Sequence, residues 1–210
     1  MSQLSDNAMN IVTTDNKTQF PLLEIKEIGS LTLWPITKIQ FEMFISETNR
    51  YGDFWYDEIL RCNPRISYPH VSKKNYEQLF ITGLHVEEVL SFSKWFGDDF
   101  RIPTVDEWRE IYRLMGSQLN LKPPSDLSYP ANEIWKKITK ISSSPIKFSM
   151  MQEGVIEWVK DGEKYTALGA PKSDVYPTTW NPLTDLVKKF KPDERLNYLG
   201  FRLIRGNEHD

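Results

Sequence analysis

The stretch from residue 81 to residue 116 constrains the fold most, because its pattern predicts two amphipathic helices joined by a tight connection. Gly97 follows the first helix, at a position that favours a residue in the left-handed conformation. Pro103 pushes the residue before it away from the helical region, so the connection is extended. Thr104 and Glu107 have the spacing of a capping box and predict the start of the second helix.

Each of these two helices has one apolar face at helical spacing, which indicates packing against a core and names no chemistry. The face expected to be buried in the first helix consists of Val86, Val89, Leu90, Ser93 and Phe96, with Trp95 beside it. The face expected to be buried in the second helix consists of Trp108, Ile111, Tyr112 and Met115.

The same stretch reads Glu-Glu, an aromatic residue, Lys-Trp-Phe-Gly, and then Arg-Ile-Pro-Thr-x-x-Glu-Trp. Three further segments accompany it in order: Trp-Pro-Ile-Thr-Lys-Ile-Gln-Phe at 34–41, Glu-Trp-Val at 157–159, and Leu-Gly-Phe-Arg-Leu-Ile-Arg at 199–205. Together these four segments resemble the formylglycine-generating enzyme, or sulfatase-modifying factor, family.

This resemblance implies an α+β chain with the C-type-lectin-like fold of the sulfatase-modifying-factor type. Such a fold has short twisted antiparallel strands, two to three packed helices and long loops. It also implies that the helix beginning near residue 38 packs beside the helix that follows His85. We expect a flexible N-terminal arm over 1–20, the family-like domain over 21–206 and a tail over 207–210.

Composition limits the class of protein. A length of 210 residues fits one domain, and 40% hydrophobic residues can fill a sizeable core. The formal charge of −3 argues against a general nucleic-acid or anionic-membrane binder. The single cysteine, Cys62, suits a reducing compartment, and the first 20 residues lack the pattern of a signal peptide. We expect a cytoplasmic protein without a membrane span.

Local patterns predict the remaining elements. The box formed by Thr37 and Gln40 predicts a helix from residue 38 to about residue 50. The stretch 51–80 is rich in proline and aromatic residues and reads as a long loop whose rings pack onto the core. The other expected elements are two strands over 22–34, a helix over 131–141, a hairpin of 155–159 with 164–168 about Asp161-Gly162, and a closing strand over 198–204.

Residues that could perform the family's chemistry are missing from the expected places. The resemblance implies a copper-binding cysteine pair before the final Gly-Phe-Arg, but 169–200 contains no cysteine. A related iron-dependent branch uses histidines, and here only His70, His85 and His209 are available, without helix-face spacing. These departures favour a catalytically degenerate member of the family, with no catalytic residue to assign.

A calcium site is the one cofactor with candidate ligands. In the family the segment that corresponds to 154–158 helps to hold a structural calcium, but Gly154 stands in place of the family's asparagine. Glu157 and Asp161 remain as weak calcium candidates. The alternative interpretation is that Glu157 forms an ion pair with Arg202 of the adjacent closing strand.

The segment 172–198 is the candidate binding surface, because lectin-like relatives with this variant of the fold use the corresponding segment to bind ligands. Its residue types combine apolar area with a polar group, as is common at protein interfaces. The alternative to a binding role for Trp180 is that it is a core residue. The candidate partner-binding residues are Lys172, Tyr176, Trp180, Asn181 and Tyr198.

We therefore predict a non-catalytic module that binds a protein or peptide, or an adaptor subunit of a bacterial intracellular complex. The alternative is a metal-dependent oxidase or oxygenase with ligands that the sequence does not reveal. Whether 51–80 or 169–198 is the binding face, and the oligomeric state, stay open. A basic cluster near the C-terminus, interrupted by acidic residues, reads as a solvated face: Lys172, Lys188, Lys189, Lys191 and Arg195.

Overall fold

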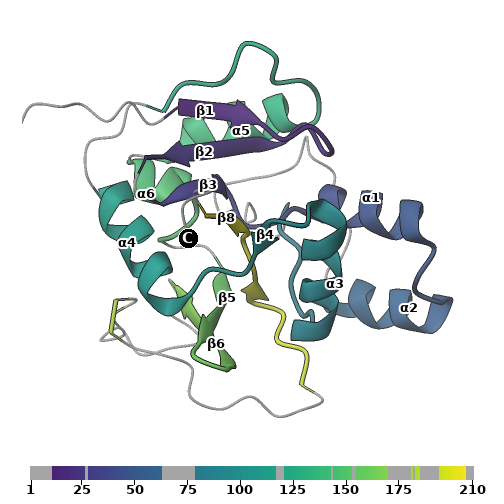
Figure 1. Cartoon of the computed structure of the whole chain (residues 1–210). Helices are drawn as coiled ribbons and strands as arrows, with labels where there is room; N and C mark the ends of the chain where they lie inside the picture. The colour runs from purple at the N-terminus through teal and green to yellow at the C-terminus, as the bar shows by residue number, and fades with distance from the viewer. Residues whose placement is uncertain are drawn as a thin grey trace, which may run out of the picture.

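The computed structural model describes residues 11–26, 28–62, 79–116, 121–142, 144–152, 155–169, 181, 183–184 and 194–206. In these residues the chain is a mixed α+β structure with six helices and two sheets (Figure 1). The helices are α1 (Lys38–Thr48), α2 (Asp53–Cys62), α3 (Val86–Phe96), α4 (Val105–Gly116), α5 (Ala131–Ile141) and α6 (Pro145–Phe148). The strands are β1 (Ile11–Thr14), β2 (Pro21–Ile25), β3 (Gly29–Thr32), β4 (Phe100–Arg101), β5 (Ile156–Asp161), β6 (Lys164–Gly169), β7 (Leu199–Gly200) and β8 (Ile204–Arg205).

The larger sheet is antiparallel and has the strand order β1-β2-β3-β8-β4. Strand β8, near the end of the chain, lies between β3 and β4, so segments far apart in sequence are neighbours in this sheet (Figure 1). The smaller sheet has the order β6-β5-β7, with β5 antiparallel to β6 and parallel to β7. The predicted hairpin about Asp161-Gly162 is confirmed, since Asp161 pairs with Lys164 across the turn.

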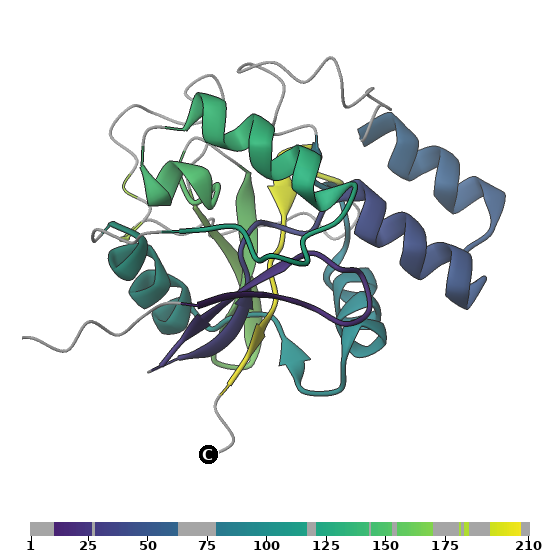
Figure 2. The same cartoon turned by 90° about the horizontal axis from the view of Figure 1, so that it is seen from above.

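Two apolar clusters fill the space on either side of these sheets. The first packs α4, α5 and α6 against β2 and β3, and Figure 2 shows α5 lying along one side of the strands. The second packs α1, α2 and α3 against β7 and the chain that follows it. The rings of Phe41 in α1 and Phe92 in α3 stack with centroids 5.5 Å apart, as expected for helices that pack side by side.

The predicted helix starts are confirmed in the hydrogen bonds. Gln40 and Thr37 form a complete capping box at the start of α1. At the start of α4, the Glu107 amide donates to the Thr104 hydroxyl, and the Thr104 amide donates to the Glu107 carboxylate. These bonds satisfy amide groups that the first turn of a helix leaves without partners.

Two details predicted for α3 are wrong. Leu90 is 39% exposed, whereas Phe92, which was not assigned to the buried face, is fully buried. The reason is that α3 packs against α1 as well as the core, which turns its buried arc toward Phe92. Gly97 does end the helix, but with a φ of 173° it is extended rather than left-handed.

Three further stretches differ from expectation. The sequence analysis assigned residues 1–20 to an arm, whereas residues 11–14 form β1 and pair with β2. The following turn is organised by Asp15, whose carboxylate accepts from the amides of Lys17, Thr18 and Phe20. The stretch predicted as loop from residue 51 contains α2, and the predicted closing strand is divided into β7 and β8.

Candidate functional site

Two clusters of the same composition organise the described residues: each joins a glutamate, an arginine and a tryptophan. We call Glu157, Arg202 and Trp108 the central triad. The Arg202 guanidinium donates to both carboxylate oxygens of Glu157, at 2.6 and 2.7 Å, and Trp108 Nε1 donates to Glu157 at 3.0 Å. All three side chains are inaccessible to solvent.

The central triad connects elements that are far apart in sequence. Glu157 lies in β5, Trp108 in α4, and Arg202 between β7 and β8. The remaining N–H groups of Arg202 donate to the carbonyls of Leu33 and Ser149, at 3.2 and 3.0 Å. A buried ion pair is tolerated only when its hydrogen-bonding groups are satisfied in this way. The cluster therefore acts as the polar centre of the scaffold.

These contacts decide between the two roles predicted for Glu157, a calcium ligand or a partner of Arg202. The expected ion pair between Glu157 and Arg202 is confirmed. Asp161 lies four residues further along β5 and is exposed, which places its Cα about 13 Å from that of Glu157. The structure does not bring these two calcium candidates together.

The second cluster consists of Glu88, Arg195 and Trp55, which we call the root triad. Arg195 Nη1 and Nη2 each donate to Glu88 at 2.8 Å, and Trp55 Nε1 also donates to this carboxylate. Glu88 further accepts from the backbone amide of His85 at 2.7 Å. The side chains of Arg195 and Glu88 are 13% and 10% exposed, so water reaches this cluster but does not surround it.

The charges of the root triad stabilise each other. Burial alone would raise the pKa of Glu88, but hydrogen bonds from Arg195, Trp55 and the His85 amide outweigh burial and hold it below its usual 4.5. The hydrogen bond with Glu88 raises the pKa of Arg195 above its usual value, although burial opposes this. Both groups are therefore ionised over the physiological range of pH.

Arg195 also reaches α2 and the turn before α3. Its Nη1 donates to the carbonyl of Gly83 at 2.9 Å, and its Nε lies 3.4 Å from the Glu58 carboxylate. Gly83 has a φ of +73°, and a Cβ there would lie 2.8 Å from the Cβ of Cys62, so only glycine fits. Burial raises the pKa of the Cys62 thiol, with the positive charge of Arg195 acting in the opposite direction.

The root triad lies where the segment 170–198 rejoins the body of the protein. The last residue before this segment, Gly169, pairs with Ile156 of β5, and the first residue after it, Leu199, pairs with the same Ile156 on the other side. Adjacent strands lie about 4.8 Å apart, so the two ends of the segment are held roughly 10 Å apart. One residue of the central strand thus marks the base of the candidate binding surface.

The predicted partner-binding residues fall on both described and undescribed positions. Tyr198 is partly buried and packs against the second apolar cluster, and its carbonyl accepts from the Ile156 amide at 3.0 Å. Asn181 is exposed, and its side-chain oxygen accepts from the amide of Leu183 at 2.9 Å. Lys172, Tyr176 and Trp180 lie outside the described residues.

Sequence reasoning missed the root triad. Arg195 was assigned to a solvated basic face, and this is wrong because its side chain is largely buried in an ion pair. The signal for α2 was present: Trp55, Ile59 and Cys62 follow at helical spacing and face the core side. Glu88, three residues after the N-cap residue His85, has the spacing of a capping residue.

The histidines and cysteine do not form a cluster in the part of the chain that the structure describes. His85 precedes α3 and contributes its backbone to Glu88, and His70 and His209 lie outside the described residues. Among the described residues, no group of three histidine, cysteine, aspartate or glutamate side chains could hold a metal ion. None of the helices described is both long enough and apolar enough to span a bilayer.

No protein-family model, curated protein or solved structure matches this chain. The likeness to the sulfatase-modifying-factor family therefore stays a prediction from the four sequence segments. Three of these segments contribute the central triad: Trp108, Glu157 and Arg202 each come from a different one.

Proposed function

We propose that this chain is a non-catalytic protein-binding or adaptor domain on a C-type-lectin-like scaffold of the sulfatase-modifying-factor type. Its binding surface is the segment 172–198, and its partner is a protein or peptide within a bacterial intracellular complex. The observation that carries the proposal is the pairing of Gly169 and Leu199 with the two edges of Ile156. A long segment held at both ends by one rigid strand is the arrangement in which loops present binding residues.

The hydrogen bonds made by the motif residues support the scaffold part of the proposal. Thr104 and Glu107 cap a helix, while Trp108, Glu157 and Arg202 bond to one another in the interior. Their polar groups are directed at each other and at backbone carbonyls. The motif residues thus account for the stability of a frame, and the binding residues are sought on the segment that the frame holds.

Residue types in the segment support a protein or peptide partner. Tyrosine, tryptophan and asparagine combine apolar contact area with hydrogen-bonding groups, and they are common in protein interfaces. The partly buried Tyr198, at the C-terminal end of the segment, packs against the second apolar cluster.

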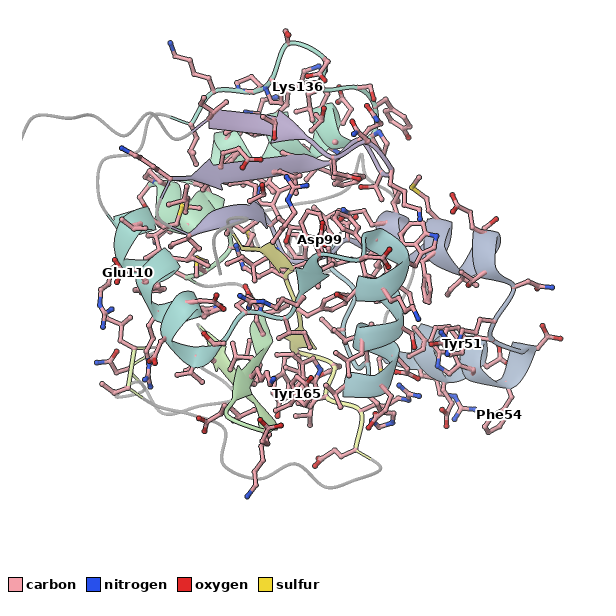
Figure 3. All side chains as sticks on the ribbon, viewed as in Figure 1. Tyr51, Phe54, Asp99, Glu110, Lys136 and Tyr165 are labelled. Carbon is pink, nitrogen blue, oxygen red and sulfur yellow. The ribbon has the colours of Figure 1, made fainter. Side chains whose placement is uncertain are left out.

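The test is affinity capture with the full chain immobilised and lysate of the source organism applied, followed by identification of the retained protein. Replacing Tyr176 and Trp180 by alanine should abolish retention of that protein. The matched control is Phe54→Ser, because Phe54 is an exposed aromatic residue on the outer side of α2 (Figure 3). We expect this control to retain the partner as the wild type does.

Two results would overturn the proposal. One is equal retention by the wild type and the Tyr176/Trp180 variant. The other is stoichiometric iron or copper in the purified protein, measured by mass spectrometry, since this would indicate the alternative of a metal-dependent oxidase or oxygenase.

A further inference from the structure

The root triad joins three stretches of chain that are far apart in sequence. Trp55 and Glu58 belong to α2, Glu88 belongs to the first turn of α3, and Arg195 belongs to the segment that carries the candidate binding surface. Arg195 contacts both helices and the turn before α3, because it donates to Glu88, to Glu58 and to the Gly83 carbonyl. A single side chain therefore ties the segment to two helices.

The chain from Arg195 to Leu199 is held at successive positions. Thr82 donates its hydroxyl to the Asn197 carbonyl at 3.0 Å, and the Ile156 amide donates to the Tyr198 carbonyl. The Gly83 amide donates to the Leu199 carbonyl at 3.1 Å. Of these ties within 194–199, the one made by Arg195 comes first along the chain.

The burial of the pair makes this tie stronger than an ordinary surface ion pair. The side chains of Arg195 and Glu88 are 13% and 10% exposed, whereas those of Arg113 and Glu110 in α4 are 58% and 50% exposed. Exposed pairs of the second kind contribute little because water and salt screen them. A pair from which most water is excluded, with two parallel hydrogen bonds, fixes geometry as well as charge.

We propose that Arg195 is a positioning residue, which holds the stretch 194–199 in place by clamping it to α2 and α3. Partner binding then depends on Arg195 although the side chain is largely buried. The dependence on partner binding rests on the function proposed above. The clamp itself does not, because it is a property of the free protein.

The clamp is tested by hydrogen–deuterium exchange of the free full-length chain, comparing the wild type with Arg195→Met and Glu88→Gln. We expect amides in 194–200 and in α2 to exchange about tenfold faster or more in both variants, because local opening no longer breaks a buried charged pair. Amides of α4, α5 and β2 that exchange through local fluctuation should keep their rates, because such openings leave the root triad closed. The matched control is Arg113→Met, which should leave 194–200 at the wild-type rate.

Two further variants separate positioning from general stability. Combining Arg195→Met with Glu88→Gln should produce no more exchange than Arg195→Met alone, since that change already removes the pair with Glu88. Arg195→Lys should restore part of the protection, because an ammonium group can reach Glu88 but cannot reproduce the fork that also holds Gly83. Unchanged exchange at 194–200, or an equal increase over the whole chain, would overturn the clamp.

The consequence for binding is measured by capture of the identified partner on immobilised Arg195→Met. Loss of retention, with exchange increased in 194–200 and α2 as predicted, supports the full proposal. Retention at the wild-type level despite faster exchange would overturn the coupling to binding and leave the proposed function intact. If the wild type itself retains no protein, the proposed function fails, while the exchange result still decides the clamp.

Discussion

The central triad and the root triad contain the same three residue types but differ in burial and in place. In both, an arginine donates two hydrogen bonds to a glutamate that also accepts from a tryptophan N–H group. The central pair, Glu157 and Arg202, is fully inaccessible to solvent, whereas the root pair, Glu88 and Arg195, retains 10% and 13% exposure. The first joins both sheets in the interior, and the second lies at the edge where the candidate surface begins.

The contrast indicates what burial does to a charged cluster. Fully enclosed charges cannot separate without a large desolvation cost, so the central triad behaves as part of a fixed frame. At the root, water can replace part of each interaction, so the same bonds can break locally while the frame stays folded. The predictions below separate these two behaviours.

The largest effect is expected for Arg202→Met. Among the described residues, this change leaves the buried carboxylate of Glu157 with the Trp108 donor alone, and it should reduce the free energy of unfolding by about 3–5 kcal/mol, measured in urea. Replacing both charges, by Glu157→Leu with Arg202→Met, should recover part of the loss. A loss below about 1 kcal/mol for the single change would contradict the assignment of this triad as the centre of the scaffold.

A smaller loss is expected for Arg195→Met, of about 2 kcal/mol, because solvent can partly hydrate Glu88 once the arginine is gone. The same urea titration measures it, with Arg113→Met as the control for loss of an exposed charge. A loss as large as that of Arg202→Met would show that the two triads do not differ in kind.

Gly83→Ala tests the turn that receives Arg195. The substitution introduces strain at a φ of +73° and a contact of 2.8 Å with Cys62, and should cost about 1–2 kcal/mol in the free energy of unfolding. Adding Cys62→Ala cannot remove the contact with the Cβ atom, so it should relieve only the part that arises from the sulfur, 2.9 Å away. Full recovery in the double variant would contradict a backbone origin of the strain.

The tryptophan donors are expected to contribute least among the substitutions. Trp108→Phe removes the N–H group that donates to Glu157 and should cost about 1 kcal/mol or slightly more, together with any loss of packing. Trp55→Phe removes the corresponding donor to Glu88 and should cost less, because water can take its place. Thermal unfolding of the two variants, measured side by side, checks this order. A larger loss for Trp55→Phe than for Trp108→Phe would contradict it.

The pH dependence of the root triad follows from the lowered pKa of Glu88. Because the carboxylate has a lower pKa in the folded than in the unfolded state, its contribution is fully present above the usual 4.5. It is lost as the pH falls through the lowered folded-state value. The difference in unfolding free energy between the wild type and Glu88→Gln should therefore be constant from pH 7 to pH 5 and decrease below about 4.5. A difference that grows toward acid would contradict this sign.

Sequence patterns predicted the parts of the molecule that depend on local chemistry. The capping boxes at Thr37 and Thr104, the hairpin at Gly162 and the helix over 131–141 all follow from residues within one turn of each other. The pairing of Glu157 with Arg202 was also predicted, since the two strands were expected to be neighbours.

The root triad could not be predicted in this way. Arg195 and Glu88 are 107 residues apart, and the sequence around Arg195 contains as many signs of a solvated charged surface as of a buried one. The exposed Leu90 was misplaced for a related reason, because the buried arc of α3 depends on which helix packs beside it. Both errors concern tertiary contacts that local periodicity does not contain.

The contrast between the triads is tested most directly by capture of the partner on Arg195→Met and Trp108→Phe, each checked to be folded. We expect Trp108→Phe, which weakens the scaffold without touching the root, to retain the partner at the wild-type level. We expect Arg195→Met to lose it. Equal retention by the two variants, whether both keep the partner or both lose it, would contradict a separate role for the root triad in positioning the binding surface.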